Sequence, residues 1–451
     1  MKTFARVCFF SVAGFCFLNP VTAAPEPPDP GAAARGPALR FSEHLVWNDF
    51  SYGFGLQAID VNGDGHLDLT VADTAAFVQT EPFSGEDLES IVDWPGNNRP
   101  AVSKSPRLRN SHVYWFENDG KGGFTRRFIA RNDVNRRLER HVFGDINRDG
   151  RPDLVIVDNL LGDLVWYENP GKEAIARGDL WKKRFIAKGT MLGAVDVTLA
   201  DFDGDGWLDA AGAGWRLGEG FKWFKNPGRT DREDWAGHVI DSAFAHATAV
   251  LAGDIDRDGR MDLLATSSTS RAVMWYQCPQ KPSQQPWKRN IIDLTPGGER
   301  EPVFMKFADL NRDGRLDVVL AWGGYGNRPE GEPRAGAIIW YEQGDVVEGR
   351  VQWKKHLIGQ LRSATDVAIG DLDGDGALDV AAIGFMPGEV SVFRNSGDPS
   401  ARWVKETVKS NWPNVNQVVI ADLDGDGRAD LAAVADYGAM ELRWWRNEGT
   451  Q

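Results

Sequence analysis

One nine-residue pattern, Asp-x-Asp/Asn-x-Asp-Gly-x-x-Asp, occurs seven times in this chain of 451 residues. The copies begin at Asp60, Asp145, Asp201, Asp254, Asp309, Asp371 and Asp422. Each copy lies at the same place in a longer repeat, and successive copies are 51 to 85 residues apart. A period of this size indicates a solenoid or a propeller.

The residues around each copy favour the propeller. In the third repeat, apolar segments 195–200 and 208–213 flank the acidic pattern, and two further extended segments follow at 221–224 and 235–240. Four short strands separated by turn residues are typical of one propeller blade. No segment sustains an apolar period of 3.6 residues, as a helix would require. The sequence therefore predicts an all-β, seven-bladed β-propeller of four-stranded blades over residues 38–451.

The last repeat lacks a fourth strand. Residues 41–46 at the other end of the chain have the same pattern as the fourth strand at 353–358. We expect residues 39–47 to complete the seventh blade and close the ring, which removes the open sheet edges of an unclosed array.

The repeated pattern has the chemistry of a site for a hard cation. Side-chain oxygens at positions 1, 3, 5 and 9 and the backbone carbonyl at position 7 surround one point, and Gly at position 6 supplies a tight turn. An EF-hand would need Glu at position 12, where the first copy has Val71 and the third has Gly212. A plain Asp-Gly turn between strands is the remaining alternative.

We expect up to seven structural Ca²⁺ ions. The candidate ligand residues, loop by loop, are Asp60, Asn62, Asp64, His66 and Asp68; Asp145, Asn147, Asp149, Arg151 and Asp153; Asp201, Asp203, Asp205, Trp207 and Asp209; Asp254, Asp256, Asp258, Arg260 and Asp262; Asp309, Asn311, Asp313, Arg315 and Asp317; Asp371, Asp373, Asp375, Ala377 and Asp379; and Asp422, Asp424, Asp426, Arg428 and Asp430. These loops account for the acidity of the chain, whose formal net charge is −14.

These loops, with the segments Asp201-Phe202-Asp203-Gly204-Asp205-Gly206 and Trp166-Tyr167-Glu168-Asn169-Pro170, resemble the FG-GAP/VCBS repeat family, in its bacterial VCBS form. Integrin α-subunit members of that family form seven-bladed propellers with calcium in such loops. The Phe-Gly and Gly-Ala-Pro signatures of the integrin repeat are not clearly present here. The resemblance implies that calcium is structural and ties the first two strands of each blade together.

The N-terminus predicts export. Residues 1–23 have the charged start, short apolar run and small-residue end of a secretory signal peptide, and residues 24–37 form a Pro/Ala/Gly-rich linker. Cys8 and Cys16 lie in the signal, so Cys278 is left alone and no intramolecular disulfide is expected. We expect a secreted or periplasmic monomer without a transmembrane segment.

Residues that the repeat does not explain indicate where a ligand binds. A long insertion occurs at about 74–112 in the first blade and a smaller one at about 322–336 in the fifth, in connections on the face opposite the acidic loops. The candidate ligand-binding residues on that face are Trp94, Trp215, Trp322, Trp412, Arg137 and Arg140. A tryptophan there stacks on a sugar or a peptide, or alternatively covers the core beneath its loop.

Two functions fit these features. The first is an exported calcium-binding propeller that binds a carbohydrate or an extracellular protein on the face opposite its calcium loops. The alternative is a carbohydrate-active enzyme, of the polysaccharide lyase or sugar dehydratase type, that acts on an acidic glycan at that face. Its candidate catalytic residues are His141, Arg140, His246 and Tyr325, because a His or Tyr base beside an Arg can remove a proton next to a carboxylate. We expect no nucleic-acid partner, since an exported chain without a recognition helix has no means of reading one.

Overall fold

The computed structural model describes residues 38–74, 111–133, 137–215, 220–229, 232–233, 235–244, 246–294, 300–324, 335–386, 388–436 and 439–450. The predicted signal peptide and linker lie outside the described residues, as do nearly all of the first-blade insertion, Trp94 and Tyr325. Residues 38–451 form one compact unit.

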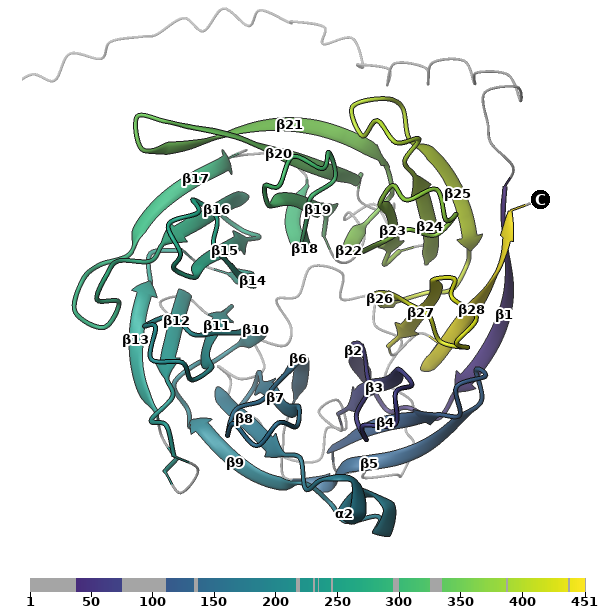
Figure 1. The fold of residues 1–451 in the computed structure, drawn as a ribbon, viewed down its shortest axis with the longest axis horizontal. Helices are drawn as coiled ribbons and strands as arrows, with labels where there is room; N and C mark the ends of the chain where they lie inside the picture. The colour runs from purple at the N-terminus through teal and green to yellow at the C-terminus, as the bar shows by residue number, and fades with distance from the viewer. Residues whose placement is uncertain are drawn as a thin grey trace, which may run out of the picture. The chain divides into compact units, whose positions relative to one another are not determined.

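The described residues form seven four-stranded antiparallel sheets, which confirms the predicted all-β propeller (Figure 1). Blade 1 consists of β2 (Gly53–Ile59), β3 (Asp68–Asp73), β4 (Ser111–Asn118) and β5 (Phe124–Asp133); blade 2 of β6 (Leu138–Gly144), β7 (Asp153–Asp158), β8 (Asp163–Glu168) and β9 (Lys182–Ala187); blade 3 of β10 (Ala194–Ala200), β11 (Asp209–Gly214), β12 (Gly220–Lys225) and β13 (Ala236–Asp241); blade 4 of β14 (Ala247–Gly253), β15 (Asp262–Ser267), β16 (Ala272–Gln277) and β17 (Lys288–Leu294); blade 5 of β18 (Glu301–Ala308), β19 (Asp317–Gly323), β20 (Ala337–Val347) and β21 (Arg350–Gln360); blade 6 of β22 (Ala364–Gly370), β23 (Asp379–Gly384), β24 (Glu389–Arg394) and β25 (Val404–Lys409); and blade 7 of β26 (Val415–Ala421), β27 (Asp430–Ala435), β28 (Glu441–Thr450) and β1 (Leu39–Trp47).

The first strand of each blade is innermost and lies beside the first strands of the two neighbouring blades (Figure 1). Contacts run from β2 through β6, β10, β14, β18, β22 and β26, and β26 contacts β2 again. One short helix, α2 (Lys172–Arg177), lies between β8 and β9. Within the part of the chain that the structure describes, no helix is long and apolar enough to cross a membrane.

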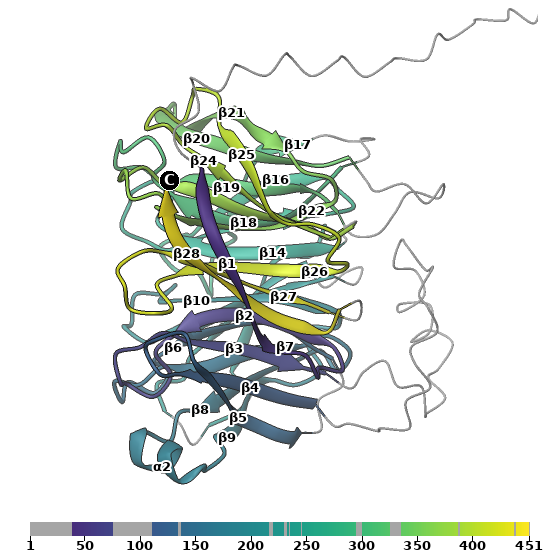
Figure 2. The same cartoon turned by 90° about the vertical axis from the view of Figure 1, so that its right-hand side faces the viewer.

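The ring closes as predicted, because the N-terminal strand joins the C-terminal blade. β1 pairs antiparallel with β28, with His44 opposite Trp444 and Glu43 opposite Trp445, and the two strands lie side by side in Figure 2. The Glu43 carboxylate also accepts a hydrogen bond of 2.8 Å from Lys409 of blade 6. Closure therefore joins segments about 400 residues apart and leaves blade 7 with four strands.

The hydrophobic core lies between blades. The second strands are buried along their whole length, as in β7, whereas the outer strand β21 consists mostly of exposed and partly buried residues. One core cluster joins Trp223 of blade 3 to Tyr276 and Trp287 of blade 4. Because each sheet packs against two others, both of its faces are apolar, and this explains the adjacent aromatic residues of the third strands.

Candidate functional site

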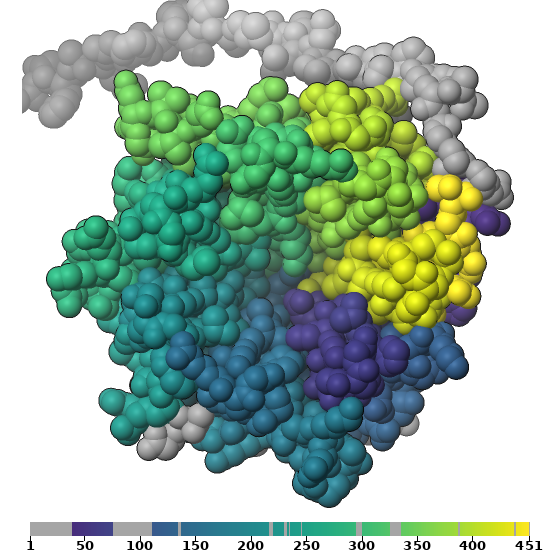
Figure 3. All heavy atoms as spheres, in the orientation of Figure 1, coloured from purple at the N-terminus to yellow at the C-terminus, as the bar shows by residue number. Residues whose placement is uncertain are grey.

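The seven aspartate loops join the first and second strands of the blades, on the side of the ring that faces the viewer in Figures 1 and 3. The first side chain of a loop organises its backbone. In loop 1, the amides of Gly63 and Gly65 donate hydrogen bonds of 2.7 and 2.9 Å to the two oxygens of Asp60. Gly65 has a φ of 92°, and the glycine at position 6 of the other six loops is also left-handed. The requirement for Gly at this position therefore follows from the backbone of the turn.

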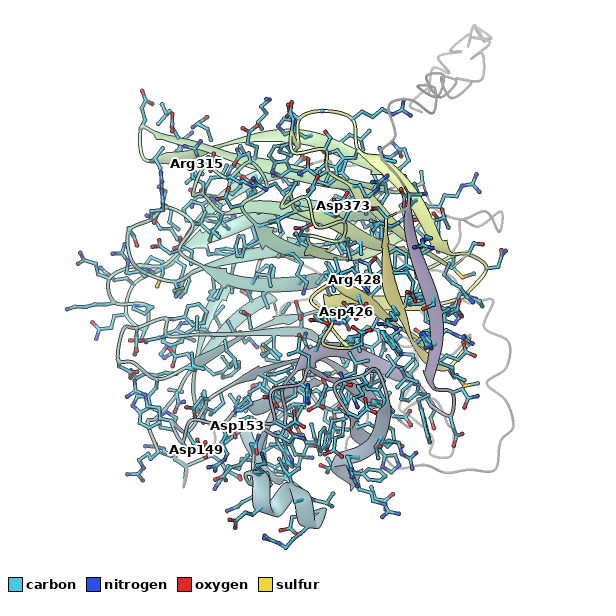
Figure 4. All side chains as sticks on the ribbon, turned by 45° about the vertical axis from the view of Figure 1, so that its right-hand side comes forward. Asp149, Asp153, Arg315, Asp373, Asp426 and Arg428 are labelled. Atoms are coloured by element: carbon cyan, nitrogen blue, oxygen red, sulfur yellow. The ribbon has the colours of Figure 1, made fainter. Side chains whose placement is uncertain are left out.

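The loop carboxylates converge. In loops 3, 4, 6 and 7, ligand oxygens of the aspartates at positions 1, 3 and 9 lie within 4.8 Å of one another. In loops 1, 2 and 5 the residue at position 3 is Asn, whose carbonyl oxygen is also a ligand for a hard cation. Figure 4 shows two of these loops, with Asp149 near Asp153 and Asp426 beside Arg428.

The aspartate at position 9 gives the strongest indication of a cation. Asp209 is fully buried, and its two oxygens accept hydrogen bonds from the backbone amides of Phe202 (3.2 Å) and Asn226 (2.7 Å). Burial, together with the neighbouring Asp203 and Asp205, raises the pKa of Asp209 to about 7. A buried carboxylate beside other carboxylates is stabilised by a counter-charge or by a proton. The oxygen donors of these loops therefore fit a hard divalent cation, and the identity of that cation stays a prediction.

The end of each third strand links neighbouring loops. In blade 3, the side-chain amide of Asn226 donates to the carbonyl of Leu208 in its own loop (3.0 Å) and to that of Ile146 in the loop of blade 2 (3.1 Å). Asn118, Asn169 and Asn447 make the same two kinds of bond, and Gln343 reaches Ile255 of blade 4 at 2.6 Å. Cys278 occupies this position in blade 4, and its thiol lies 3.4 Å from the Phe202 carbonyl.

A second group of polar residues, the axial cluster, consists of Arg140, Asp196, Lys306 and Asp366 on the innermost strands β6, β10, β18 and β22. Arg140 crosses the centre of the ring: its guanidinium lies 2.9 Å from the Asp366 carboxylate of blade 6 and 3.3 Å from the centre of the Phe304 ring of blade 5. Arg140, Asp196 and Asp366 are buried, whereas Lys306 is partly exposed.

The charged groups of the axial cluster act on one another. One oxygen of Asp196 and one of Asp366 accept hydrogen bonds from the first strand of the next blade, at Val250 (3.0 Å) and Val418 (3.3 Å). Burial raises the pKa of Asp196 to about 6, although Arg140 opposes that rise. Burial also lowers the pKa of Lys306. The cluster therefore combines a carboxyl group and an amine whose pKa values burial shifts in opposite directions, up for Asp196 and down for Lys306.

Blade packing does not require these charges. The strand position of Arg140, Asp196 and Asp366 is occupied by Gly55, Ala249, Phe304 and Gln417 in the other blades. Sequence reasoning did not select Lys306. Alignment of the seven first strands provides the missing signal, because Lys306 stands where other blades carry residues such as Val142, Leu251 and Val419.

The structure places the candidate catalytic residue His141 in the interior, next to Arg140 in sequence but away from the axis. His141 is 3% exposed, and its Nε2 lies 2.8 Å from the Thr70 hydroxyl of blade 1. Gly55 leaves room for the ring, because a Cβ there would lie 2.5 Å from the His141 Nδ1. Burial, and then the charge of Arg140, lower the pKa of His141 to about 3, so the imidazole is neutral.

The candidate residues Trp215, in the β11–β12 connection, and His246, in the β13–β14 connection, form a stacked pair with ring centroids 3.9 Å apart and planes at 9°. The His246 Nδ1 also contacts the Thr269 hydroxyl, and burial lowers the pKa of the imidazole. Both side chains are partly exposed, so this pair has the geometry of a surface platform.

The remaining candidates pack into the protein. Trp322 and Trp412 are 4% and 3% exposed and belong to core clusters, and the Trp412 indole donates to Glu441 at 2.9 Å. Arg137 is buried in an ion pair of 2.5 Å with Glu139. These placements correspond to the alternative that a tryptophan covers the core beneath its loop. A ligand-binding role for these three residues stays a prediction.

The fold and the loops together define a β-propeller with acidic repeat loops, and comparison identifies its family. The FG-GAP-like repeat model matches residues 145–212, 201–265, 309–382 and 371–433, more than half of the chain. The chain therefore belongs to the FG-GAP-like repeat family. The narrower bacterial VCBS assignment stays a prediction.

Two individual proteins are similar to the chain. Aldos-2-ulose dehydratase of Phanerodontia chrysosporium is 26% identical over 283 residues, which cover 55% of this chain and 29% of that protein. The chain thus spans less than a third of the length of this relative. A crystal structure of BBS1N in complex with ARL6DN, soaked with mercury, matches with a TM-score of 0.49 at 11% identity, over 90% of this chain and 96% of that chain. No functional parallel follows from similarity at that level.

Proposed function

We propose that this FG-GAP propeller is exported, holds calcium in its aspartate loops and binds a carbohydrate at the axial cluster. The observation that carries the binding site is the Arg140–Asp366 pair across the ring axis, with Lys306 and Asp196 close enough to affect each other's charge. Arg140, Asp196 and Asp366 are each the third residue of their strand, near the end opposite the aspartate loops. Charged donors and acceptors at a ring axis suit a ligand rich in hydroxyl or carboxylate groups.

Calcium is the cation that the loop donors favour. Loops with three or four carboxylates, a backbone carbonyl and no thiol suit a hard ion that accepts many oxygen ligands, and such crowded sites suit Mg²⁺ poorly. In this proposal the bound ion neutralises the buried position-9 aspartates and thereby stabilises the junction between the first two strands of each blade.

A second candidate function is sugar dehydration or elimination, favoured by the named activity of the dehydratase relative. In such a reaction a base removes the proton from the carbon next to a carbonyl or carboxylate, a carbon–carbon double bond forms, and the β-oxygen leaves as water or as a protonated alcohol. Lys306 and Asp196 would supply the base and the acid, and Arg140 would stabilise the negative charge on the substrate oxygen.

Binding and turnover on the same samples test both functions. The full mature chain in calcium buffer is titrated calorimetrically with 2-keto sugars, neutral oligosaccharides and acidic polysaccharides, and ultraviolet absorbance reports any unsaturated product. Lys306→Met and Asp196→Asn probe the axial cluster, and His141→Ala and His246→Ala probe the earlier candidates. Lys354→Met, on the outer face, is the matched control.

The outcomes separate the functions. Sugar binding that Lys306→Met abolishes, without any product, supports a binding protein, and product formation that Lys306→Met or Asp196→Asn abolishes supports the enzyme. Sugar binding that survives both axial substitutions contradicts the proposed site. Binding only to extracellular proteins would replace the carbohydrate by a protein ligand.

A further inference from the structure

The seven aspartate loops differ in how many basic side chains reach them. Among the described residues, no Lys or Arg side chain reaches loop 1. One reaches each of loops 2, 4 and 5, where the arginine at position 7 pairs with the aspartate at position 5 of its own loop: Arg151 with Asp149, Arg260 with Asp258, and Arg315 with Asp313. Two basic side chains reach each of loops 3, 6 and 7.

The second cation comes from the end of the third strand. Lys225 of β12 contacts Asp203 and lies 2.8 Å from Asp205, which are positions 3 and 5 of loop 3. Arg394 of β24 lies 3.4 Å from Asp373 in loop 6, and Arg446 of β28 lies 2.5 Å from Asp424 in loop 7. This residue, the last before the bridging Asn, Gln or Cys described above, is called the strand-end residue below.

The chemical type of the strand-end residue corresponds to the side chain at position 3 of its loop: an acceptor faces Asn, and a donor faces Asp. Where position 3 is Asn, in loops 1, 2 and 5, the strand-end residue is Glu: Glu117, Glu168 and Glu342. Where position 3 is Asp, in loops 3, 4, 6 and 7, it is a donor: Lys225, Gln277, Arg394 and Arg446. The match holds in all seven blades, so it is a rule of the repeat.

The contacts explain the match. The Asn62 amide donates to Glu117 at 3.3 Å, while its carbonyl oxygen accepts the Asp64 amide at 2.9 Å. In loop 3, one oxygen of Asp203 contacts Lys225 and the other accepts the Asp205 amide at 3.3 Å. In both kinds of loop the strand-end residue holds the outer atom of the position-3 side chain, which leaves an oxygen directed into the loop. Such partners orient metal ligands and tune their affinity.

In loops 3 and 6 the other cation comes from the preceding loop. Arg148 at position 4 of loop 2 donates to the Gly206 carbonyl in loop 3, and Arg312 of loop 5 donates to the Gly376 carbonyl in loop 6. In loop 7 the other cation is Arg428, at position 7 of the loop itself, which pairs with Asp426. Loops 3, 6 and 7 therefore have two internal positive charges beside their four aspartates.

We propose that the strand-end residue orients the third ligand of every loop and divides the loops into two affinity classes. Loops 1, 2, 4 and 5 bind calcium tightly, whereas in loops 3, 6 and 7 the internal cations compete with calcium and hold the aspartates when calcium is scarce. This inference rests on the proposed calcium binding. A unit positive charge within a few ångströms of a divalent ion weakens its binding by about tenfold or more, even in a water-like dielectric.

Loops 3 and 4 provide a matched pair for the test, because both have Asp at positions 1, 3, 5 and 9 while their strand-end residues are Lys225 and Gln277. Calcium alone is titrated into the full mature chain against a chromophoric chelator, which counts tight and weak sites. We expect four tight and three weak sites in the natural protein. Lys225→Gln should give five tight sites, and Gln277→Lys should give three.

The outcomes distinguish an error in the affinity classes from an error in the calcium proposal itself. Circular dichroism verifies that each variant is folded, and the two substitutions act in opposite directions, so general destabilisation cannot mimic the expected pair of results. A natural protein that takes up no calcium would overturn the calcium proposal itself. Calcium uptake in one uniform class, or a tight-site count that neither substitution changes, would overturn only the affinity classes.

Discussion

Replacement of Cys278 by Asn should stabilise the propeller. In blade 3 the side-chain amide of Asn226 makes two hydrogen bonds, one of them to the loop of the preceding blade. The Cys278 thiol makes only weak contacts, at 3.4 Å with the corresponding Phe202 carbonyl and at 3.6 Å with the adjacent Pro279 carbonyl. A thiol is a poor donor, so the junction between blades 3 and 4 is weaker than its neighbours.

The gain can be worked out from these bonds. Asn at position 278 would replace the thiol contact by an N–H donor to Phe202 and add a second donor toward the Met261 carbonyl, the counterpart of Leu208 in blade 4. At about 1 kcal/mol for each buried hydrogen bond, less the cost of the larger side chain, the net gain is about 1–2 kcal/mol. For a domain of this size that corresponds to a rise in Tm of about 1–2 °C.

The assay is urea unfolding in saturating calcium, followed by tryptophan fluorescence, on the natural protein and three variants. Cys278→Ser controls for removal of the thiol. Asn226→Cys installs the weak junction between blades 2 and 3 and should cost about 2 kcal/mol, because two buried carbonyls lose their donors. If Cys278→Asn lowered the urea midpoint while Asn226→Cys left it unchanged, the bridging role of this position would be refuted.

Three further predictions concern calcium, closure and pH. Removal of calcium by a chelator should lower Tm strongly, because each filled loop contributes about 2.7 kcal/mol to the free energy of unfolding at a hundredfold excess of calcium over its Kd. An unchanged Tm would mean that the loops are empty. Deletion of residues 38–47 removes β1 and leaves β28 as an open sheet edge, so we expect the protein to aggregate or to lose its fold. Size-exclusion chromatography detects the aggregates, and a monomer that melts like the full chain would contradict closure. In the folded protein the pKa of His141 is about 3, below its ordinary value of 6.5, so only the unfolded state takes up a proton as the pH falls from 7 to 5. The free energy of unfolding therefore decreases by about 2 kcal/mol over that range. His141→Val copies the residue found at this position in four other blades and should remove that part of the acid sensitivity. Equal slopes of stability against pH in the two proteins would contradict the buried neutral imidazole.

Much of the architecture could be read from local patterns. The acidic loops, the four strands around them and the missing last strand are all features of single segments, and repetition made each of them easier to recognise. The closure by residues 39–47 followed from counting strands, and the structure confirms it. Turn chemistry and strand alternation act over a few residues, so a linear chain displays them directly.

The candidate ligand-binding residues were harder to judge for the opposite reason. Trp322, Trp412 and Trp215 are alike in sequence, since each is a tryptophan outside the repeat, yet the first two are buried in the core and the third stacks on His246 near the surface. Burial depends on which segment covers the side chain, and that segment belongs to another part of the chain. Lys306 was missed because a single lysine in an apolar strand stands out only when the seven first strands are aligned, and only the structure shows that it lies near Asp366 and Asp196.

The sequence by itself determined the number of blades, the positions of the acidic loops and the donors that suit a hard cation, because all of these depend on short segments and their repetition. Only the tertiary structure decided which loops share cations and what lies at the axis. Arg148 donates a hydrogen bond to the loop of the next blade, and Asn226 donates one to the loop of the preceding blade. Arg140 forms an ion pair with Asp366, which lies more than 200 residues away in the sequence. The packing of the blades into a closed ring brings these groups together. The sequence of a single repeat does not show which residues of two blades come into contact.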